Sequence, residues 1–135
     1  MFTIIFPVLN ERLRLESGVT RTVEYLQSIA FEDYEIIIVD NGSEDETPQI
    51  AENLCKKYDK VKYERINVRG VGAAFRRGVE VSHGDVVGYM DIDLSTNIRH
   101  LGEAIHLFET QPEIQYINGS RFARESDTRG RKWYR

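Results

Sequence analysis

Two aspartates separated by one residue follow an apolar run in "VVGYMDIDLST", residues 86–96. In an extended segment, residues i and i+2 point the same way, with Cα atoms roughly 6.6 Å apart. Asp91 and Asp93 would then repel each other by ~4 kcal/mol if their charges came within ~4 Å at a surface-like dielectric. A divalent cation between the two carboxylates would replace this repulsion with attraction, and carboxylate oxygens are suitable ligands for Mg²⁺ or Mn²⁺. The pair predicts a metal site; the alternative is a strand-end turn in which Asp caps the following helix.

Other segments with polar or glycine chemistry also follow apolar, β-branched runs. They are "PVLNE" (7–11), "DNGSEDET" (40–47), "RGVGAAFRRG" (69–78) and "GSR" (119–121). In "RGVGAAFRRG", the N–H groups of Gly70 to Gly72 could line a negatively charged ligand at a helix start, or the glycines could simply allow a tight turn and close helix packing. A dinucleotide fingerprint is disfavoured, because the segment follows the third predicted strand and has Phe75 in place of the last glycine.

Asp40 ends the apolar run "IIIVD", and Gly42 and Ser43 then turn the chain. With the adjacent Asn41, Asp40 could accept hydrogen bonds from a nucleobase edge or cap the loop backbone, and the residue types alone leave both interpretations open. The three histidines show no metal-ligand spacing.

The elements that must position these residues alternate along the chain. β-Branched and aromatic runs predict strands at 2–6, 34–40, 61–66, 85–91 and 114–119. Between them, apolar residues at spacings of three and four predict helices around 19–30 and 98–108. Thr47 and Pro48 supply an N-cap and a first helical residue, and so predict a helix to about Tyr58. A further helix through Phe75 and Val79 is expected to end at a Gly84 C-cap.

Strands alternating with helices predict an α/β fold with an open, mostly parallel, doubly wound sheet. In such sheets, ligands bind beyond the carboxyl ends of the strands. All the polar segments described above follow strands, so they are expected to share one edge of the sheet.

The composition is that of a globular protein: 135 residues, 41% hydrophobic, 30% charged and a net charge of −4. The length predicts one domain over 1–135. No run approaches the ~20 apolar residues of a membrane helix, no signal peptide is expected, and the single cysteine fits a reducing compartment. Residues 121–135 carry six basic and two acidic residues, or +4, which leaves −8 on residues 1–120. One interpretation of this basic segment is that it binds an anionic partner, and the other is that it is a solvated C-terminal segment. No nucleic-acid partner is expected.

The ordered series "FPVLNE", "VDNGSEDET", "RGVGAAFRRG", "YMDIDLST" and "GSR" resembles the family 2 glycosyltransferases of the GT-A fold. It is most similar to the branch that makes polyprenyl-phosphate sugars, the dolichyl-phosphate mannose and glucose synthases and their bacterial relatives. The resemblance covers nearly the whole chain. It implies a metal-dependent inverting transferase that moves a sugar from a UDP- or GDP-linked donor to a polyprenyl phosphate.

The resemblance also implies roles for individual residues. Asp91 and Asp93 would hold Mg²⁺ or Mn²⁺ against the donor diphosphate, and the backbone of Ile92 would pack on the nucleotide. Arg121 would contact a donor or acceptor phosphate, and Asp40 would contact the base of the donor nucleotide. The remaining nucleotide-pocket residues would be Pro7, Leu9, Glu11, Ser43 and Gly70.

Three positions depart from the family pattern. Leu9 replaces a tyrosine of the mannose synthases, Val71 replaces a common lysine, and Ser95 replaces a glutamine that adds a metal contact in some members. These differences bear on the subfamily more than on the chemistry. Similar enzymes continue past "GSR", so the chain is expected to be a donor-binding part whose acceptor half lies beyond Arg135. The expected location is the cytoplasm, at the cytoplasmic face of a membrane.

Other functions remain as alternatives. A nucleotide-sugar-binding module without activity differs only in lacking the acceptor half. "DIDLST" also fits the start of a haloacid-dehalogenase-type phosphatase motif, but that motif usually lies on an early strand and needs later acids that this chain does not offer. Sugar nucleotidyltransferases need a glycine-rich, basic loop after the first strand, and "PVLNE" is not such a loop.

Overall fold

The computed structural model describes residues 1–120 of the chain, as four strands alternating with four helices. The strands are β1 (Phe2–Val8), β2 (Tyr34–Asp40), β3 (Val61–Arg65) and β4 (Val86–Tyr89), and the helices are α1 (Leu15–Ser28), α2 (Thr47–Lys57), α3 (Val71–Val81) and α4 (Arg99–Thr110). The chain divides into two compact units, Met1–Gly102 and Glu103–Arg135. The first contains the whole sheet with α1 to α3, and the second, as far as residue 120, contains most of α4 and the coil after it.

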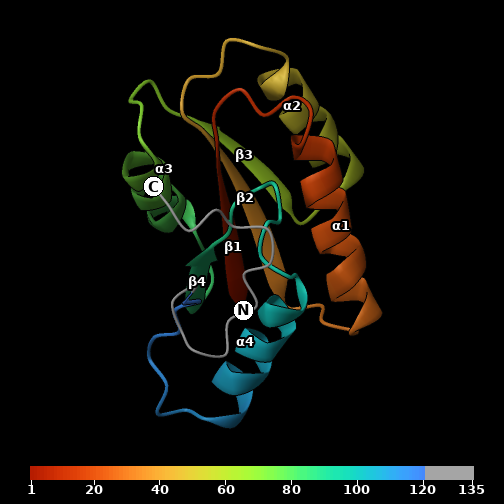
Figure 1. The fold of residues 1–135 in the computed structure, drawn as a ribbon, viewed down its shortest axis with the longest axis vertical. Coiled ribbons are helices and arrows are strands. Elements are labelled where there is room, and N and C mark those ends of the chain that lie inside the picture. Colours follow the sequence, from red (N-terminus) through yellow and green to blue (C-terminus); the bar gives the residue numbers. More distant parts are fainter. Residues whose placement is uncertain (121–135) are drawn as a thin grey trace, which may run out of the picture. The chain divides into compact units, whose positions relative to one another are not determined.

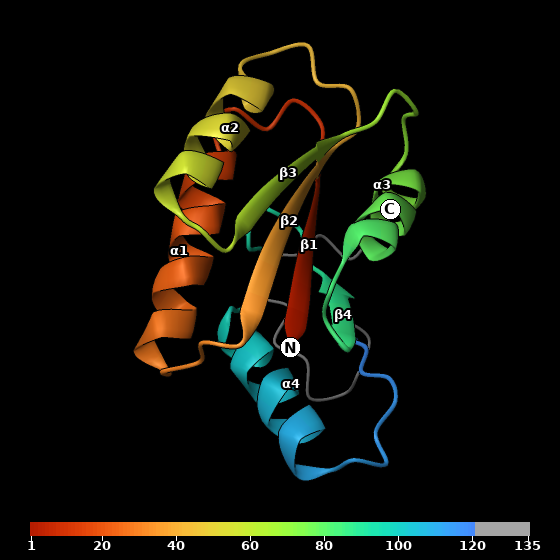
Figure 2. The same cartoon turned by 180° about the vertical axis from the view of Figure 1, so that it is seen from behind.

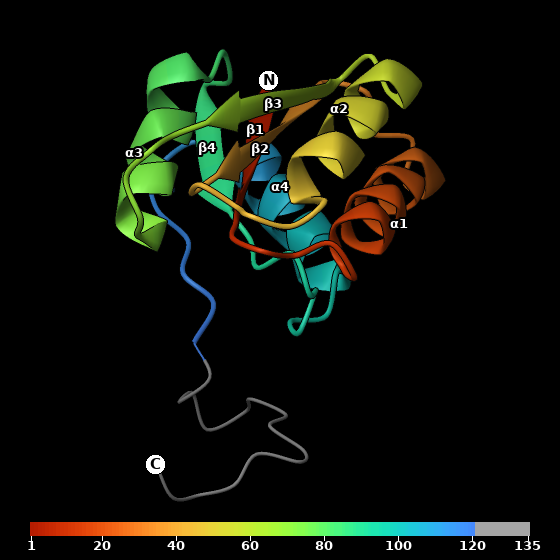
Figure 3. The same cartoon turned by 90° about the horizontal axis from the view of Figure 1, so that it is seen from above.

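The sheet has the strand order β3-β2-β1-β4, and every pairing is parallel. Helices α1 and α2 lie on one face of this sheet and α3 on the other (Figures 1 and 3). The chain therefore winds outward from β1 through β2 to β3, and then crosses back to place β4 on the other side of β1 (Figure 2). This is the open, doubly wound α/β arrangement expected from the sequence.

The core lies around the two central strands. β2 is buried along its whole length, and β1 is buried at most positions, because helices cover both faces. Successive side chains of a strand point to opposite faces, and Ile5, Ile37 and Val39 pack with Ala74 of α3. The near-continuous apolar runs in the sequence are thus explained by two-sided burial.

β4 differs from this pattern, although the sequence run 85–91 looked equally apolar. It is an edge strand of four residues, and its last two residues, Gly88 and Tyr89, are exposed. Phe75 of α3 packs against the Tyr89 ring at a centroid distance of 5.5 Å. The described residues thus cover one face of Tyr89 and leave half of this side chain exposed.

Pro7 explains where β4 separates from β1. The last hydrogen bond between β1 and β4 runs from the Met90 N–H to the Ile5 carbonyl, at 3.1 Å. Along β1, the N–H and C=O groups of successive residues point alternately toward β2 and toward β4. The nitrogen of Pro7, two residues after Ile5, therefore points toward β4. It has no N–H to continue the ladder. The two strands therefore part at Met90, and the residues that follow β4 are free to turn away.

Three local predictions were wrong. Residues 114–119 form no strand and belong to a coil in which Tyr116 is 78% exposed. Strand propensity reflects packing on a pleated, half-buried surface, which this segment does not have within the described residues. Helix α3 ends at Val81, and its C-cap residue is Ser82 and not Gly84. The Gly84 N–H instead donates to the Thr3 hydroxyl at 3.0 Å.

Thr47 is the first residue of α2 and not its N-cap. Its N–H donates to Asp45 Oδ1 at 2.9 Å, so Asp45 satisfies the start of the helix. Burial would raise the pKa of Asp45, but the hydrogen bonds from Thr47 and the Arg12 N–H lower it overall. The Thr47 hydroxyl accepts the N–H of Glu11, in the loop after β1, at 2.8 Å.

Candidate functional site

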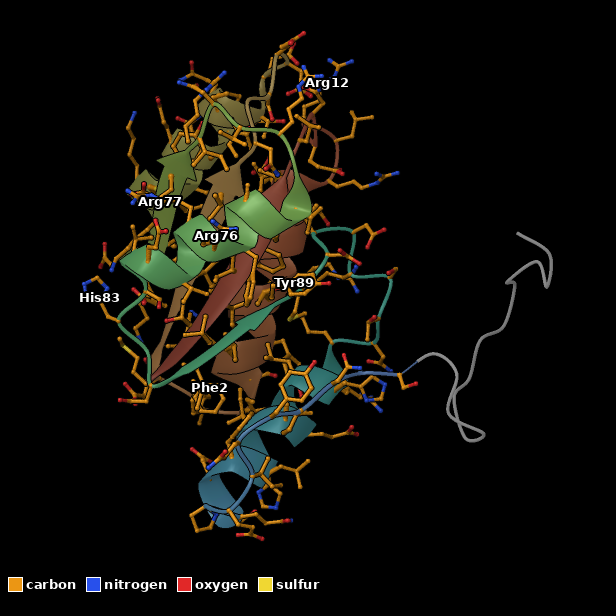
Figure 4. The ribbon with its side chains drawn as sticks, turned by 90° about the vertical axis from the view of Figure 1, so that its left-hand side faces the viewer. Phe2, Arg12, Arg76, Arg77, His83 and Tyr89 are labelled. Atoms are coloured by element: carbon orange, nitrogen blue, oxygen red, sulfur yellow. The ribbon has the colours of Figure 1, made fainter. Side chains whose placement is uncertain are left out.

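The loops predicted to share one edge of the sheet follow the carboxyl ends of β1, β2, β3 and β4. Figure 4 shows Arg12, which follows β1, at one end of the sheet, and Phe2 and His83 at the opposite end. The strand order reverses between β1 and β4, and this switch point is where ligands of doubly wound sheets bind.

The two aspartates lie on a tight turn at the switch point. The Leu94 N–H donates to the Asp91 carbonyl at 3.1 Å, and Leu94 has a left-handed backbone with φ of 49°. Ile92 is 4% exposed, whereas both carboxylates are exposed. We call residues 91–94 the acidic turn. The expected extended segment is thus a turn, and the burial of Ile92 leaves the flanking aspartates at the surface.

The donor set of the acidic turn fits Mg²⁺ or Mn²⁺. Asp93 Oδ1 accepts the Ser95 N–H at 2.9 Å, which leaves the other oxygen available. The Asp91 carboxylate makes no hydrogen bond or ion pair with the described residues, and among those residues no group of three His, Cys, Asp or Glu side chains converges there. A site with two carboxylates suits a hard cation that keeps water and phosphate oxygens in its remaining positions.

The loops after β1 and β2 are joined by reciprocal hydrogen bonds. The Asn10 N–H donates to the Ser43 hydroxyl at 2.9 Å, and the Glu44 N–H donates to Asn10 Oδ1 at 2.8 Å. The Glu11 N–H donates to the Thr47 hydroxyl at 2.8 Å. The left-handed backbone of Asn10, with φ of 54°, makes this exchange possible. Two segments 33 to 36 residues apart therefore form one rigid rim, which also positions Leu9, 38% exposed, and the half-buried Pro7.

Asp40 is fully buried, and both of its oxygens have partners. Oδ1 accepts the Ser43 N–H at 2.7 Å, and Oδ2 accepts the Tyr63 hydroxyl at 2.9 Å. The Arg65 guanidinium lies 3.7 Å from Oδ2 and also donates to the Ser43 carbonyl at 2.9 Å. Burial and the carboxylate together raise the pKa of Tyr63 to about 12. This is the geometry of the loop cap, one of the two roles that the sequence left open.

The loop after β3 brings a helix N-terminus to the same edge. Gly70, at the N-cap of α3, has φ of 134°, a conformation that only glycine adopts readily. No side chain caps the start of α3, where the first N–H groups of a helix lack partners within the helix. Arg69 forms an ion pair with Glu44 at 2.8 Å, which links this loop to the one after β2.

Two residues near the site, Tyr63 and Arg65, were not identified from the sequence, and a third, Asn41, was considered there only as the neighbour of Asp40. Tyr63 and Arg65 support Asp40, and they alternate along β3 with Lys62 and Glu64, so the strand pattern alone did not mark them. Asn41, 3% exposed, has a side-chain oxygen without a hydrogen-bond partner among the described residues. A buried, unpaired acceptor next to the rim is a candidate contact for a ligand N–H or O–H group. Arg121 lies outside the described residues.

The chain's similarity to known proteins agrees with this geometry. The family described as "Glycosyl transferase family 2" matches residues 3–135. The chain belongs to that family. It is 35% identical over 122 residues to the glycosyltransferase AglD of Haloferax volcanii, 32% over 143 residues to the dolichyl-phosphate beta-glucosyltransferase of Mus musculus, and 31% over 133 residues to the dolichol-phosphate mannosyltransferase of Pyrococcus furiosus.

These alignments include 89%, 98% and 98% of this chain. They include only 19%, 44% and 36% of the three relatives, so the chain spans less than half the length of each. The part that matches is the part that contains the sheet and the loops described above.

Solved structures confirm the fold. Glucosyl-3-phosphoglycerate synthase of Mycobacterium tuberculosis, in complex with UDP, superposes with a TM-score of 0.66 at 23% identity over 89% of this chain and 45% of its own. A mannosyltransferase of Pyrobaculum calidifontis, in complex with GDP-Man and Mn²⁺, gives 0.56 at 20% identity over 68% of this chain and 27% of its own. The architecture is that of the GT-A glycosyltransferases. Within the described residues, no helix is both long and apolar enough to cross a membrane.

Proposed function

We propose that the chain binds a UDP- or GDP-linked sugar as the donor site of an inverting glycosyltransferase whose acceptor is a polyprenyl phosphate. The observation that carries the proposal is the position of the acidic turn, at the switch point of a parallel sheet and on the same edge as the β1 and β2 loops. Family membership supports sugar transfer from a nucleotide donor. The names of the mouse and Pyrococcus relatives support a polyprenyl phosphate acceptor.

The residues divide by the part of the donor that they would serve. Asp91 and Asp93 would hold Mg²⁺ or Mn²⁺ against the diphosphate, with the backbone of Ile92 on the nucleotide. Pro7, Leu9, Glu11 and Ser43 would line the nucleotide pocket, and Asp40 would serve the base through the loop that it caps. The N–H groups at Gly70 and the side chain of Arg121 would meet phosphate oxygens.

In the proposed reaction, an acceptor phosphate oxygen forms a bond to the anomeric carbon. The carbon–oxygen bond to the donor diphosphate breaks from the opposite face, which inverts the configuration. Asp91 and Asp93 would hold a cation that would neutralise the charge developing on the leaving diphosphate. A lipid phosphate is already ionised near pH 7, so this route needs no general base among the residues of the site.

A second candidate is a nucleotide-sugar-binding module that transfers nothing by itself. The observation that favours it is coverage, because the chain spans less than half of the relatives that it matches. The transferase would meet its lipid acceptor at the cytoplasmic face of a membrane, whereas a binding module without an acceptor would need no lipid surface.

Ligand-induced stabilisation tests donor binding. UDP-glucose, GDP-mannose and NAD are titrated with and without Mn²⁺ while Tm is followed. We expect one sugar nucleotide to raise Tm by several degrees only when Mn²⁺ is present, since a ligand at 100 times its Kd adds about 2.7 kcal/mol, and NAD to have no effect. Stabilisation by none of the three would contradict the proposal.

Transfer is then tested with a labelled sugar nucleotide and polyprenyl phosphate. Radiolabel in the lipid phase supports the transferase, and metal-dependent binding without transfer supports the binding module.

A further inference from the structure

We infer that Gly18 is a positioning residue for the acidic turn: the missing side chain at this position lets Ile92 dock on α1, and this contact sets where Asp91 and Asp93 stand. The inference rests on the proposed function of the acidic turn and deepens it. Gly18 lies in the first half of α1, more than 70 residues from the turn in the sequence.

The turn approaches α1 so closely that no side chain fits at position 18. A Cβ atom built on Gly18 would lie 2.3 Å from the Ile92 carbonyl oxygen, and 2.7 Å and 3.0 Å from two of its side-chain carbons. Separations below 3.0 Å from a backbone atom require the backbone to move. Alanine is the smallest possible replacement, and it would displace the turn itself.

The conformation of Gly18 gives no other reason for glycine. It is a regular helical residue: its N–H donates to the Arg14 carbonyl at 2.8 Å, and its carbonyl accepts the Thr22 hydroxyl at 2.9 Å. Glycine inside a helix is about 1 kcal/mol less favourable than alanine. The close approach of Ile92 is therefore the feature of the structure that accounts for glycine here.

The helix that receives Ile92 is fixed by the core. Leu15, Val19, Val23 and Leu26 of α1 are at most 2% exposed. In the acidic turn, Ile92 is the buried side chain, while both aspartates are exposed. A shallow cavity of about 180 Å³ remains beside this contact, with Arg14, Ser17 and Asp93 in its lining. The contact thus holds the metal-binding carboxylates relative to a rigid element.

The test compares Mn²⁺ affinity in the Gly18→Ala variant with that in a matched control. Gly78→Ala also places a Cβ in a buried helix position, 2.6 to 2.9 Å from Ile5 side-chain atoms, but on α3, against the sheet and without contact with the acidic turn. Mn²⁺ is titrated into the chain with UDP present, and free Mn²⁺ is measured by its electron paramagnetic resonance signal. We expect Gly18→Ala to bind Mn²⁺ at least tenfold more weakly, and Gly78→Ala to lose stability while keeping its Mn²⁺ affinity within twofold.

Unchanged Mn²⁺ affinity in Gly18→Ala overturns the inference, as does an equal loss in both variants. If the wild-type chain itself fails to bind Mn²⁺, the metal site of the proposed function fails, which is a distinct result. Should Gly18→Ala not fold by circular dichroism, substitutions at Ile92 decide the matter. Ile92→Ala removes the anchor and is expected to weaken Mn²⁺ binding, whereas Ile92→Val keeps a β-branched anchor and is expected to restore it; equal affinity in these two variants contradicts the inference.

Discussion

Asp93 has two tasks that can be separated at the level of single atoms. One oxygen accepts the Ser95 N–H and so helps to shape the chain after the acidic turn, and the other is available to a cation. An asparagine at this position keeps the first function through its side-chain carbonyl and loses the charge that serves the second. Substitution here therefore tests metal binding without removing the turn.

We expect Asp93→Asn to abolish the Mn²⁺ dependence of donor binding and to weaken Mn²⁺ binding at least tenfold, about 1.4 kcal/mol, with little change in Tm without ligand. Asp59→Asn is the matched control, because it removes one exposed carboxylate in the connection from α2 to β3. Calorimetric titration of Mn²⁺ in the presence of UDP measures the difference. Retained affinity in Asp93→Asn would remove Asp93 from the metal site.

At the scale of elements, a buried carboxylate of β2 connects β1, β3 and the residues after α3, at the edge of the sheet opposite the site. Glu35 of β2 accepts hydrogen bonds from the Thr3 hydroxyl at 2.7 Å, the Lys62 ammonium at 2.7 Å and the His83 N–H at 2.6 Å. Burial would raise the pKa of Glu35, but these three donors outweigh it and lower the pKa to about 2. The charged form of Glu35 thus stabilises the fold.

Because the pKa of Glu35 is lower in the folded chain than its ordinary 4.5, this contribution is fully present above pH 4.5 and is lost as the pH falls toward 2. The difference corresponds to roughly 3 kcal/mol at pH 7. We expect Glu35→Gln to lower the free energy of unfolding by up to that amount at pH 7 and by less than half of it at pH 3. Urea denaturation measures both values. Glu32→Gln, an exposed carboxylate paired with Lys60, is the control and should change little.

At the scale of the whole molecule, stability is concentrated in the central strands. β1 and β2 are buried on both faces, whereas β4 is a four-residue edge strand with two exposed residues. Local opening requires less free energy where fewer contacts are broken. The site therefore lies between two stable strands, β1 and β2, and a less stable edge strand, β4.

Hydrogen exchange measured by mass spectrometry should show this difference. We expect amides of residues 36–40 to exchange at least tenfold more slowly than amides of residues 86–89. Addition of Mn²⁺ with the donor that raises Tm should slow exchange in peptides that contain residues 90–96 and 9–12, and leave the peptide around Glu35 unchanged. Uniform protection across all strands, or ligand effects confined to the amino end of the sheet, would contradict the proposed location of the site.

Much of this arrangement could be predicted from local pattern. The strand at 34–40 has the bounds that its apolar run indicated, and helices formed at all four expected places. The order of strands and helices was enough to predict a doubly wound sheet and to bring Asp40 and Asp91 to the same edge. The strand at 114–119 was wrong because a strand needs a surface to pair with and pack on, and no local pattern reports that surface.

The sequence by itself determined the four helices, four of the five predicted strands and the edge of the sheet that contains the site, because periodicity and motif spacing depend on neighbours along the chain. Only the tertiary structure decided that Asp40 is held by Tyr63 and Arg65, that Glu35 meets Lys62 and His83, and that Ile92 docks at Gly18. Each of these contacts joins residues more than 20 positions apart, so it depends on strand register and helix packing, which no local window of residues contains.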